Sequence, residues 1–261
     1  MSFAMKNPQL VIFDMDGLIF DTERLFMERK HEVLRQMGYP AREEDYVKTI
    51  GLSGILLREK LLEIYGPEYP AEEITRKTRK AVDAYVETYG PDVKPGIEDL
   101  LQWLCGRGIL CCVASSTVHV YVEKFLLRAK LDGYFRCDRQ SVGDHADICC
   151  GEESALENGI PEVNLKRDFC GADLCVVGGD EVVRSKPEPD IFLAACKRMN
   201  VRPEDALVLE DSENGVRAAC AAQIPVICIP DLKQPSPEIA KMAAAVLPSA
   251  REVLMLLKEQ S

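Results

Sequence analysis

The chain has 261 residues, a length that one large or two modest domains would fill. Apolar residues make up 47% and charged residues 29%, an ordinary globular composition that excludes low-complexity and collagen-like chains. The 43 acidic against 32 basic residues give a net charge of −11, which disfavours binding to nucleic acid or to anionic membranes. No apolar run approaches the roughly 18 residues of a membrane span.

The N-terminal segment carries one lysine and a short apolar run before an acidic residue, which is not the pattern of a secretory signal peptide. We therefore expect a cytoplasmic protein. Cys111, Cys112, Cys175 and Cys228 lie inside apolar runs, so they are expected to be small core residues.

Five short apolar runs have strand length and mostly lack polar alternation, as strands buried on both faces of a parallel sheet do. These runs are Leu10–Phe13, Ile109–Ala114, Leu174–Val177, Ala206–Leu209 and Val226–Ile229. Helical patterns separate the later runs, at Val118–Ala129, Pro189–Met199 and Asn214–Ala222. This alternation predicts an α/β fold, a doubly wound parallel sheet with right-handed crossovers.

The interval from residue 20 to residue 94 has helix signals and no convincing strand. Helical patterns cover Thr22–Met37, Gly54–Tyr65 and Ala71–Tyr89, and a linker with two Pro and two Gly follows at residues 90–96. We therefore predict a separate helical domain at 20–94, inserted into an α/β core formed by 1–19 and 95–261.

A polar stretch at 137–171 is predicted to be an insertion within the core. The stretch contains four cysteines and one histidine: Cys137, His145, Cys149, Cys150 and Cys170. Their spacing matches no standard zinc site, so we expect free thiols, with a structural metal as the alternative. Because the stretch leads into the amino end of the third strand, we expect it to lie on the surface, away from the carboxyl edge of the sheet.

Ligands of open α/β sheets bind beyond the carboxyl ends of the strands. The polar residues expected there are Asp14, Asp16, Ser115, Ser116, Thr117, Lys186, Glu210 and Asp211. Carboxylates this close cannot all stay ionised without a cation, and oxygen ligands suit Mg²⁺. A metal, a lysine, hydroxyls and a spare carboxylate together indicate phosphoryl transfer.

Four motifs occur in one order along the chain: DMDGLIFDTE (Asp14–Glu23), VASST (Val113–Thr117), RSKPEPDIF (Arg184–Phe192) and VLEDSENG (Val208–Gly215). This set resembles the haloacid dehalogenase superfamily, specifically the branch of β-phosphoglucomutase and small-metabolite phosphatases with an α-helical cap. The resemblance covers nearly the whole chain and implies that the helical domain is a cap over the active site.

The resemblance implies that Asp14 is a nucleophile that forms an aspartyl-phosphate, and that Asp16 acts as general acid and then as general base. It also implies that Mg²⁺ is bound by Asp14, the Asp16 carbonyl and Asp211, with Glu210 reaching it through water. Gly17 would let the loop turn tightly.

The same resemblance implies that Ser115 hydrogen-bonds the phosphoryl oxygens and that Lys186 neutralises them while pairing with Asp14. The remaining candidate phosphate- or substrate-binding residues are Ser116, Thr22 and Gly54. Two alternatives stay open: Ser115 as the N-cap of the following helix, and Thr22 simply as the start of a helix.

Two positions depart from β-phosphoglucomutase. Gly54 stands where the mutase has an Arg that grips the second phosphate, and Phe26 stands where it has a His. We therefore expect a Mg²⁺-dependent phosphatase of a small, sugar-phosphate-like metabolite, with a phosphosugar mutase as the alternative. A phosphate-accepting signalling module, whose domain is much shorter and lacks the DxDG motif, is a remote alternative. The expected assembly is a monomer or a weak homodimer.

Overall fold

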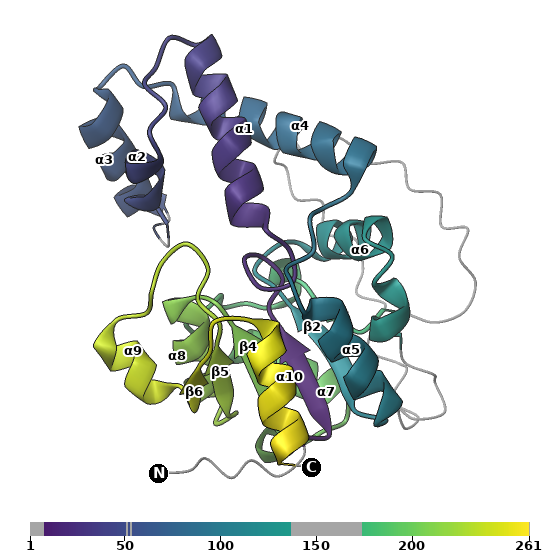
Figure 1. Cartoon of the computed structure of the whole chain (residues 1–261). Coiled ribbons are helices and arrows are strands. Elements are labelled where there is room, and N and C mark those ends of the chain that lie inside the picture. Colours follow the sequence, from purple (N-terminus) through teal and green to yellow (C-terminus); the bar gives the residue numbers. More distant parts are fainter. Residues whose placement is uncertain (1–7, 51, 53, 137–173, 261) are drawn as a thin grey trace.

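The computed structural model describes residues 8–50, 52, 54–136 and 174–260 (Figure 1). Its centre is a six-stranded sheet in the order β3-β2-β1-β4-β5-β6, in which all neighbouring strands are parallel. The strands are β1 (Leu10–Phe13), β2 (Leu110–Ala114), β3 (Val176–Val177), β4 (Ala206–Glu210), β5 (Val226–Cys228) and β6 (Ala245–Val246). Each of the first five strands lies within a predicted run, except that β4 extends one residue beyond its run, to Glu210. The sixth is two partly exposed residues, too short to show as an apolar run.

Helices cover both faces of the sheet, which confirms the predicted doubly wound α/β fold. One face packs against α5 (Ile97–Gly106), α6 (His119–Arg128) and α10 (Ala250–Glu259). The other packs against α7 (Asp190–Arg198), α8 (Glu213–Ala221) and α9 (Pro237–Met242). Short 3₁₀ turns η1 (Asp132–Phe135), η3 (Gly179–Glu181) and η4 (Pro203–Asp205) precede or follow strands. Among these helices, α5, α9 and α10 were not predicted from the sequence.

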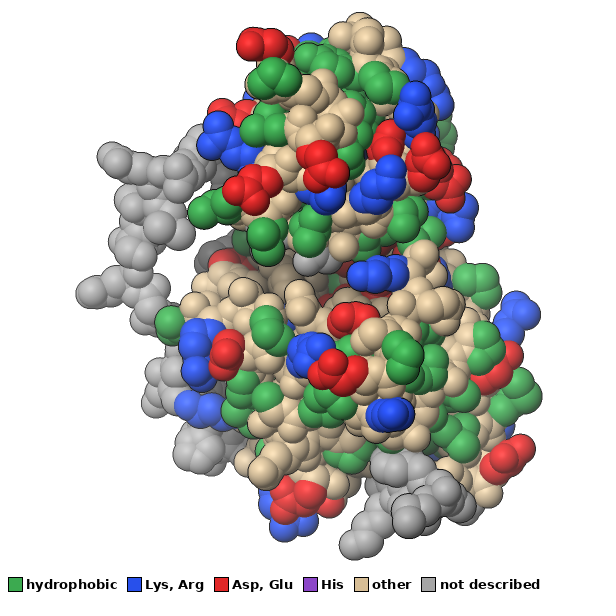
Figure 2. Space-filling model, turned by 90° about the vertical axis from the view of Figure 1, so that its left-hand side faces the viewer, with side chains coloured by type: hydrophobic (Ala, Val, Ile, Leu, Met, Phe, Trp, Pro, Cys, Tyr) green, Lys and Arg blue, Asp and Glu red, His purple; other side chains and the backbone are tan. Residues whose placement is uncertain are grey.

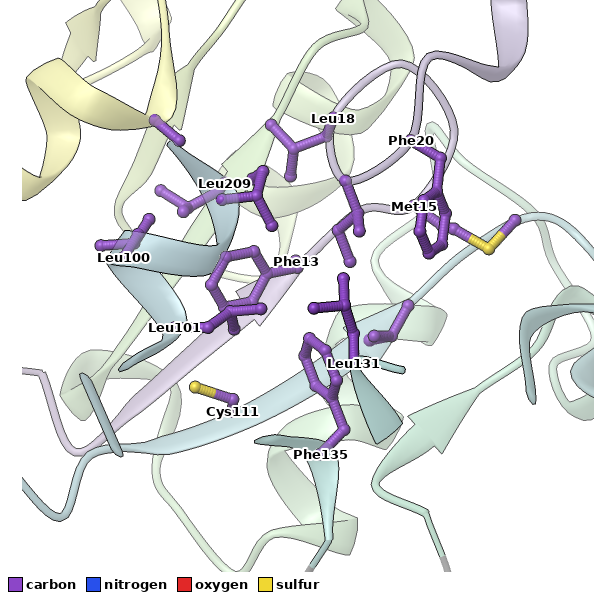
Figure 3. Close-up of a cluster of buried hydrophobic side chains, with 14 of the residues drawn as sticks. Phe13, Met15, Leu18, Phe20, Leu100, Leu101, Cys111, Leu131, Phe135 and Leu209 are labelled. Atoms are coloured by element: carbon purple, nitrogen blue, oxygen red, sulfur yellow. The ribbon is translucent and has the colours of Figure 1, made fainter. Parts of the chain in front are cut away.

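The central strand is apolar throughout because its side chains alternate between two cores. Val11 and Phe13 point into the cluster with Leu100, Leu101 and Leu209 (Figure 3), and Leu10 and Ile12 into the opposite cluster. All four residues of β1 are fully buried. The four cysteines predicted to be core residues are also buried: Cys111, Cys112, Cys175 and Cys228.

The register of the central strands brings their carboxyl ends level. Phe13 of β1 pairs with Val113 of β2 and with Leu209 of β4. The polar residues that follow these three strands therefore emerge at one edge of the sheet.

The helices between β1 and α5 stand over that edge (Figure 1). They are α1 (Thr22–Gln36), α2 (Glu43–Val47), α3 (Gly54–Tyr65) and α4 (Ala71–Tyr89). Of these, α1, α3 and α4 share a small core around Leu34, Leu61 and Ile74. Their two connections to the sheet run side by side, since Phe20 bridges Val93. Within the described residues, none of the helices is both long and apolar enough to cross a membrane. The domain boundaries at residues 20 and 94 stay a prediction.

The predicted insertion at 137–171, with its cysteines and histidine, lies outside the described residues. The residues that flank it are close together, because Arg136 pairs with Leu174 and the Cys175 amide donates to the Phe135 carbonyl at 2.6 Å. Both flanks lie at the amino end of β3, at the edge opposite the carboxyl ends of the strands. The position of the insertion itself remains a prediction.

Candidate active site

A tight turn after β1 presents two aspartates at the carboxyl edge of the sheet. Gly17 has a φ of +81°, and its amide donates to the Phe20 carbonyl at 3.0 Å. A Cβ atom at Gly17 would lie 2.3 Å from Asp211 Oδ2. Glycine is therefore required here both for the left-handed backbone and for the close approach of Asp211. The turn leaves Asp14 and Asp16 on the side of the sheet edge that faces the helices.

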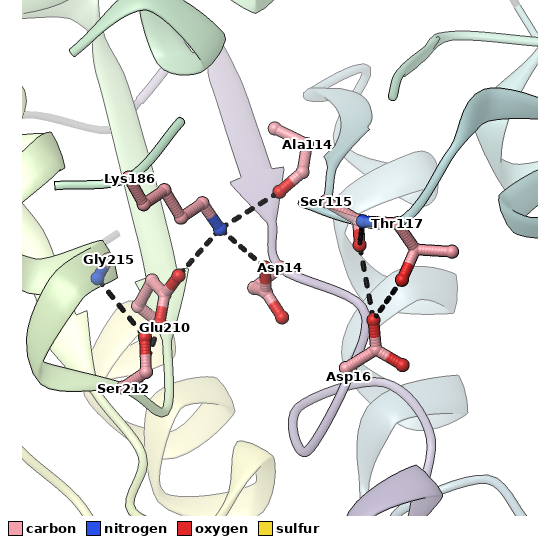
Figure 4. Close-up of polar contacts among 9 residues, drawn as sticks. All are labelled: Asp14, Asp16, Ala114, Ser115, Thr117, Lys186, Glu210, Ser212 and Gly215. Atoms are coloured by element: carbon pink, nitrogen blue, oxygen red, sulfur yellow. Dashed lines mark hydrogen bonds and ion pairs between the residues drawn. The ribbon is translucent and has the colours of Figure 1, made fainter. Parts of the chain in front are cut away.

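Lys186 joins the ends of three strands (Figure 4). Its Nζ donates to Asp14 Oδ1 at 2.5 Å, to Glu210 Oε1 at 2.7 Å and to the Ala114 carbonyl at 3.2 Å. The three charged side chains are at most 9% exposed. The pairing of Lys186 with Asp14 agrees with the arrangement that the motif implied.

Burial dominates the electrostatics of this cluster. It raises the pKa of Asp14 to about 7, with Lys186 acting against this shift and Glu210 and Asp16 acting with it. Burial alone would lower the pKa of Lys186, but Asp14 and Glu210 outweigh it and raise that pKa above its usual value. The pKa of Asp211 is also raised, first by burial and then by the neighbouring carboxylates. One lysine does not balance this many carboxylates, so the cluster favours a further cation.

Asp14, Glu210 and Asp211 each offer a carboxylate oxygen, and these oxygens lie within 4.8 Å of one another. Clustered hard oxygen ligands fit Mg²⁺. Glu210 is held in place by the start of α8, where the Ser212 amide and hydroxyl donate to its Oε2 at 2.8 and 2.9 Å. A Cβ at Gly215 would lie 1.7 Å from Glu210 Oε1, so only glycine leaves room for this carboxylate.

Two hydroxyls hold Asp16. Thr117 Oγ1 donates to Asp16 Oδ2 at 2.8 Å and Ser115 Oγ donates to the same oxygen at 3.2 Å (Figure 4). The Thr117 amide in turn donates to Ser115 Oγ at 3.0 Å. Ser115 is not the N-cap of α6, because Val118 occupies that position. The sequence interpretation placed Thr117 at the strand end but gave it no role, although it lies in the same motif as Ser115.

The remaining candidates lie outside this network. Ser116 is exposed, and Thr22, at the start of α1, is buried with no hydrogen-bond partner for its Oγ1 among the described residues. Gly54 begins α3 with a φ of +55°, and nothing lies within 4 Å of the position of its Cβ. Phe26 packs against the core cluster and brings no polar group to the site.

Further polar residues around the turn were missed by the sequence interpretation. Asp231 follows β5 and forms an ion pair with Lys94, which lies in the linker after α4. The rule that ligand-binding residues follow parallel strands would have found Asp231. From the helical part, the Tyr46 hydroxyl donates to Glu23 Oε2 at 3.1 Å. Burial raises the pKa of Glu23, and the charges of Asp16 and Asp231 add to this effect.

These residues lie between two parts of the molecule. Figure 2 shows a hollow between the helical part above and the α/β part below. The arrangement combines a buried carboxylate paired with lysine, a clustered oxygen site for a cation and a second carboxylate held by hydroxyls. Such a set can bind a phosphate ester, attack its phosphorus and move a proton to the leaving oxygen.

Comparison with known proteins gives the same interpretation. Two family models, both described as haloacid dehalogenase-like hydrolase, match residues 11–137 and 155–223. The chain is 32% identical over 222 residues to a probable pseudouridine-5'-phosphatase of Drosophila melanogaster. The alignment covers 84% of this chain and 80% of that relative.

Two further relatives extend the comparison. The chain is 54% identical over 233 residues to a bifunctional riboflavin kinase/FMN phosphatase of Arabidopsis thaliana. The alignment covers 89% of this chain and 51% of that longer protein. A crystal structure of a putative β-phosphoglucomutase from Thermotoga maritima superposes with a TM-score of 0.68 at 26% identity, covering 96% of this chain and 98% of that one.

Proposed function

Because the chain belongs to the haloacid dehalogenase-like hydrolases and is a phosphoric monoester hydrolase, we propose that it cleaves a small phosphorylated metabolite in a Mg²⁺-dependent reaction through a phosphorylated Asp14. The observation that carries this proposal is the contact of Lys186 with both Asp14 and Glu210, beside Asp211. This contact leaves Asp14 buried and oriented, next to the carboxylate oxygens of Glu210 and Asp211.

In the first step, an Asp14 carboxylate oxygen attacks phosphorus and the bond from phosphorus to the ester oxygen breaks. The leaving oxygen takes a proton from Asp16. In the second step, water attacks the phosphorus, gives its proton to Asp16 and releases inorganic phosphate from Asp14. The first step leaves Asp14 phosphorylated and Asp16 deprotonated, and the second restores both residues, so turnover is multiple.

The other site residues would balance the negative charge of the phosphate and hold Asp14 and the cation in position. Lys186, which holds Asp14, would neutralise the phosphoryl oxygens, and the Ser115 hydroxyl, which here donates to Asp16, would hydrogen-bond them. Asp14, Glu210 and Asp211, with the Asp16 carbonyl, would hold Mg²⁺, which supplies positive charge where anionic oxygens gather.

The helical part at residues 20–94 would be the cap of this site. It stands over the carboxyl edge and contributes Glu23 and Tyr46 near Asp16. A cap in this position would exclude bulk water from the phosphorylated aspartate until the leaving group has departed.

Hydrolysis is favoured over phosphosugar mutation by two positions in the helical part. Gly54 has no side chain that could bind a second phosphate, and Phe26 is an apolar side chain that packs against the core. A mutase must hold a bisphosphate between two transfers, and these positions offer no cation for that purpose.

The names of two relatives indicate a substrate class. Pseudouridine 5'-phosphate and FMN are both phosphate monoesters of a primary alcohol on a polyhydroxylated carbon chain or ring. We extend this class to the present chain, so that the leaving oxygen would be a primary alkoxide that needs the proton of Asp16.

The test is phosphate release from a panel of phosphate monoesters with Mg²⁺, with Asp14→Asn as the decisive variant. Wild-type protein should release far more than one equivalent of phosphate, because each turnover frees Asp14. Asp14→Asn should be inactive, since an amide does not attack phosphorus. Activity of Asp14→Asn above a few per cent of wild type, or conversion of a sugar 1-phosphate to its 6-phosphate without phosphate release, would overturn the proposal.

A further inference from the structure

Asp231 has an environment that the catalytic steps do not explain. Its side chain is 7% exposed, and its Oδ1 forms an ion pair with the Lys94 ammonium group. Its other oxygen, Oδ2, is buried and has no hydrogen-bond partner among the described residues. A buried carboxylate oxygen without a partner is costly, so this oxygen indicates that another group acts on it.

The direction of that oxygen identifies the kind of group. Asp231 Oδ2 lies 3.4 Å from the position that a Cβ of Gly17 would take, and Asp211 Oδ2 lies 2.3 Å from the same position. The two carboxylates are therefore turned toward the same side of the Gly17 turn. Two carboxylates with little solvent around them, one buried and one partly buried, repel each other unless positive charge lies between or beside them.

Lys94 supplies only part of that positive charge. Its Nζ pairs with Asp231 Oδ1, the carboxylate oxygen other than the unpartnered Oδ2. Its backbone amide donates to the Ile19 carbonyl at 2.8 Å. Lys94 is thereby fixed to the connection between sheet and helices rather than to the clustered oxygens of Asp14, Glu210 and Asp211.

We propose that Asp231 is an outer carboxylate of the metal site, which strengthens divalent-cation binding at Asp211, and that its ion pair with Lys94 links this site to the linker of the helical part. The metal site itself rests on the proposed function. The positive charge of the cation would thus act on Oδ2 of Asp231, while Lys94 of the linker pairs with Oδ1. Carboxylates around the direct ligands commonly change metal affinity about 10–100-fold.

The alternative is that Asp231 serves only as an anchor for Lys94, and charge distinguishes the two roles. Asp231→Asn and Lys94→Met both break the ion pair, so a pure anchor predicts the same effect for both. An outer carboxylate predicts opposite effects: removing its negative charge weakens cation binding, and removing the neighbouring positive charge does not.

The experiment measures Mn²⁺ affinity of the full chain by electron paramagnetic resonance and Mg²⁺ affinity by calorimetry, with no substrate present. We expect Asp231→Asn to weaken binding about tenfold. Lys94→Met should bind as tightly as wild type or a few-fold more tightly. Asp45→Asn is the matched control, because Asp45 is another buried carboxylate paired with a lysine, Lys48, but lies in α2, and its affinity should be unchanged.

Unchanged affinity in Asp231→Asn, or an equal loss in Asp231→Asn and Lys94→Met, would overturn the inference while leaving the proposed function intact. Wild-type protein that binds neither ion would instead overturn the metal-dependent function. Circular dichroism reports whether each variant folds. If Asp231→Asn does not fold, Lys94→Met decides, because a lower cation affinity in that variant contradicts the charge argument.

Discussion

Lys186 is the residue on which the buried cluster depends most directly. It contacts Asp14 and Glu210 in a region with almost no solvent, so loss of its charge would leave carboxylates buried without a partner, at a cost of about 3–5 kcal/mol. The residue was predictable because its motif was recognisable and its chemistry suits a phosphate ester. Its second contact, with Glu210, was not, because that contact depends on how closely the loop after β3 approaches the end of β4.

Thr117 positions Asp16, and this role predicts a substrate-dependent defect. Thr117→Val keeps the shape of the side chain but removes the hydroxyl that donates to Asp16 Oδ2 at 2.8 Å. We expect kcat for an alkyl phosphate to fall about tenfold, because proton transfer to the leaving oxygen is impaired. An aryl phosphate with an acidic leaving group needs that proton less, so its kcat should fall less, with KM unchanged in both cases.

Steady-state kinetics with one alkyl and one nitrophenyl ester checks this expectation. The control is Thr88→Val, the same substitution at a hydroxyl in α4 that donates to the Ala84 carbonyl at 2.8 Å. Equal losses of kcat for both esters would show that Thr117 acts on something other than the proton of Asp16.

At the scale of elements, the site depends on loops that brace one another. The Gly179 amide donates to the Thr117 carbonyl at 2.9 Å, which joins the loop after β3 to the loop after β2. Glu181, in η3, accepts from the Gly178 amide at 2.7 Å and lies 2.7 Å from His119 Nδ1 at the start of α6. The elements that carry Lys186 and Thr117 are therefore joined through an ionic contact outside the site.

That contact predicts a pH-dependent stability. Hydrogen bonds with Glu123 and Glu181 raise the pKa of His119 to about 9 from the usual 6.5. Because the folded pKa is the higher one, the stabilisation is complete below pH 6.5, decreases between pH 6.5 and 9, and is absent above. His119→Gln should remove it, which lowers the free energy of unfolding by about 1–2 kcal/mol near pH 6, allowing for partial solvent screening.

Urea denaturation of wild type and His119→Gln at several pH values measures this difference. The two curves should converge as the pH rises past 9. A constant difference across that range would mean that the histidine contributes through packing rather than through its charge.

At the scale of the whole molecule, acidic charge is the main electrostatic feature. The net charge of −11 includes a cluster of carboxylates that is buried rather than spread over the surface. Folding must therefore bring like charges together in a region of low dielectric constant, which costs free energy. A divalent cation bound to the folded chain would offset this cost.

Mg²⁺ should accordingly raise the unfolding temperature, and EDTA should lower it and abolish activity. Binding to the folded state alone stabilises by about 2.7 kcal/mol at a cation concentration 100 times the dissociation constant. Thermal unfolding followed by fluorescence, with and without Mg²⁺, measures the shift. Asp211→Asn, which removes one of the three clustered carboxylates, should respond much less. An unfolding temperature that is the same in Mg²⁺ and EDTA would contradict a cation site at this cluster.

The sequence by itself determined five of the six strands of the sheet, most helices of the described residues and the motif residues. Burial on both faces makes β1 and β4 continuous apolar runs, and polar residues directly after such runs must emerge at the carboxyl edge, as Asp14 and Glu210 do. These are local properties, because they depend on which residues an element buries and where it ends.

Tertiary structure alone decided which side chains meet. Asp16 takes its hydrogen bonds from Ser115 and Thr117 rather than from Ser116, since the backbone after β2 turns Ser116 outward. Lys94 and Asp231 are separated by 137 positions and meet only because the linker runs beside the turn that follows β1. Contacts of this kind depend on sheet register and on how loops pack, and no local pattern of residues encodes the distance between two loops.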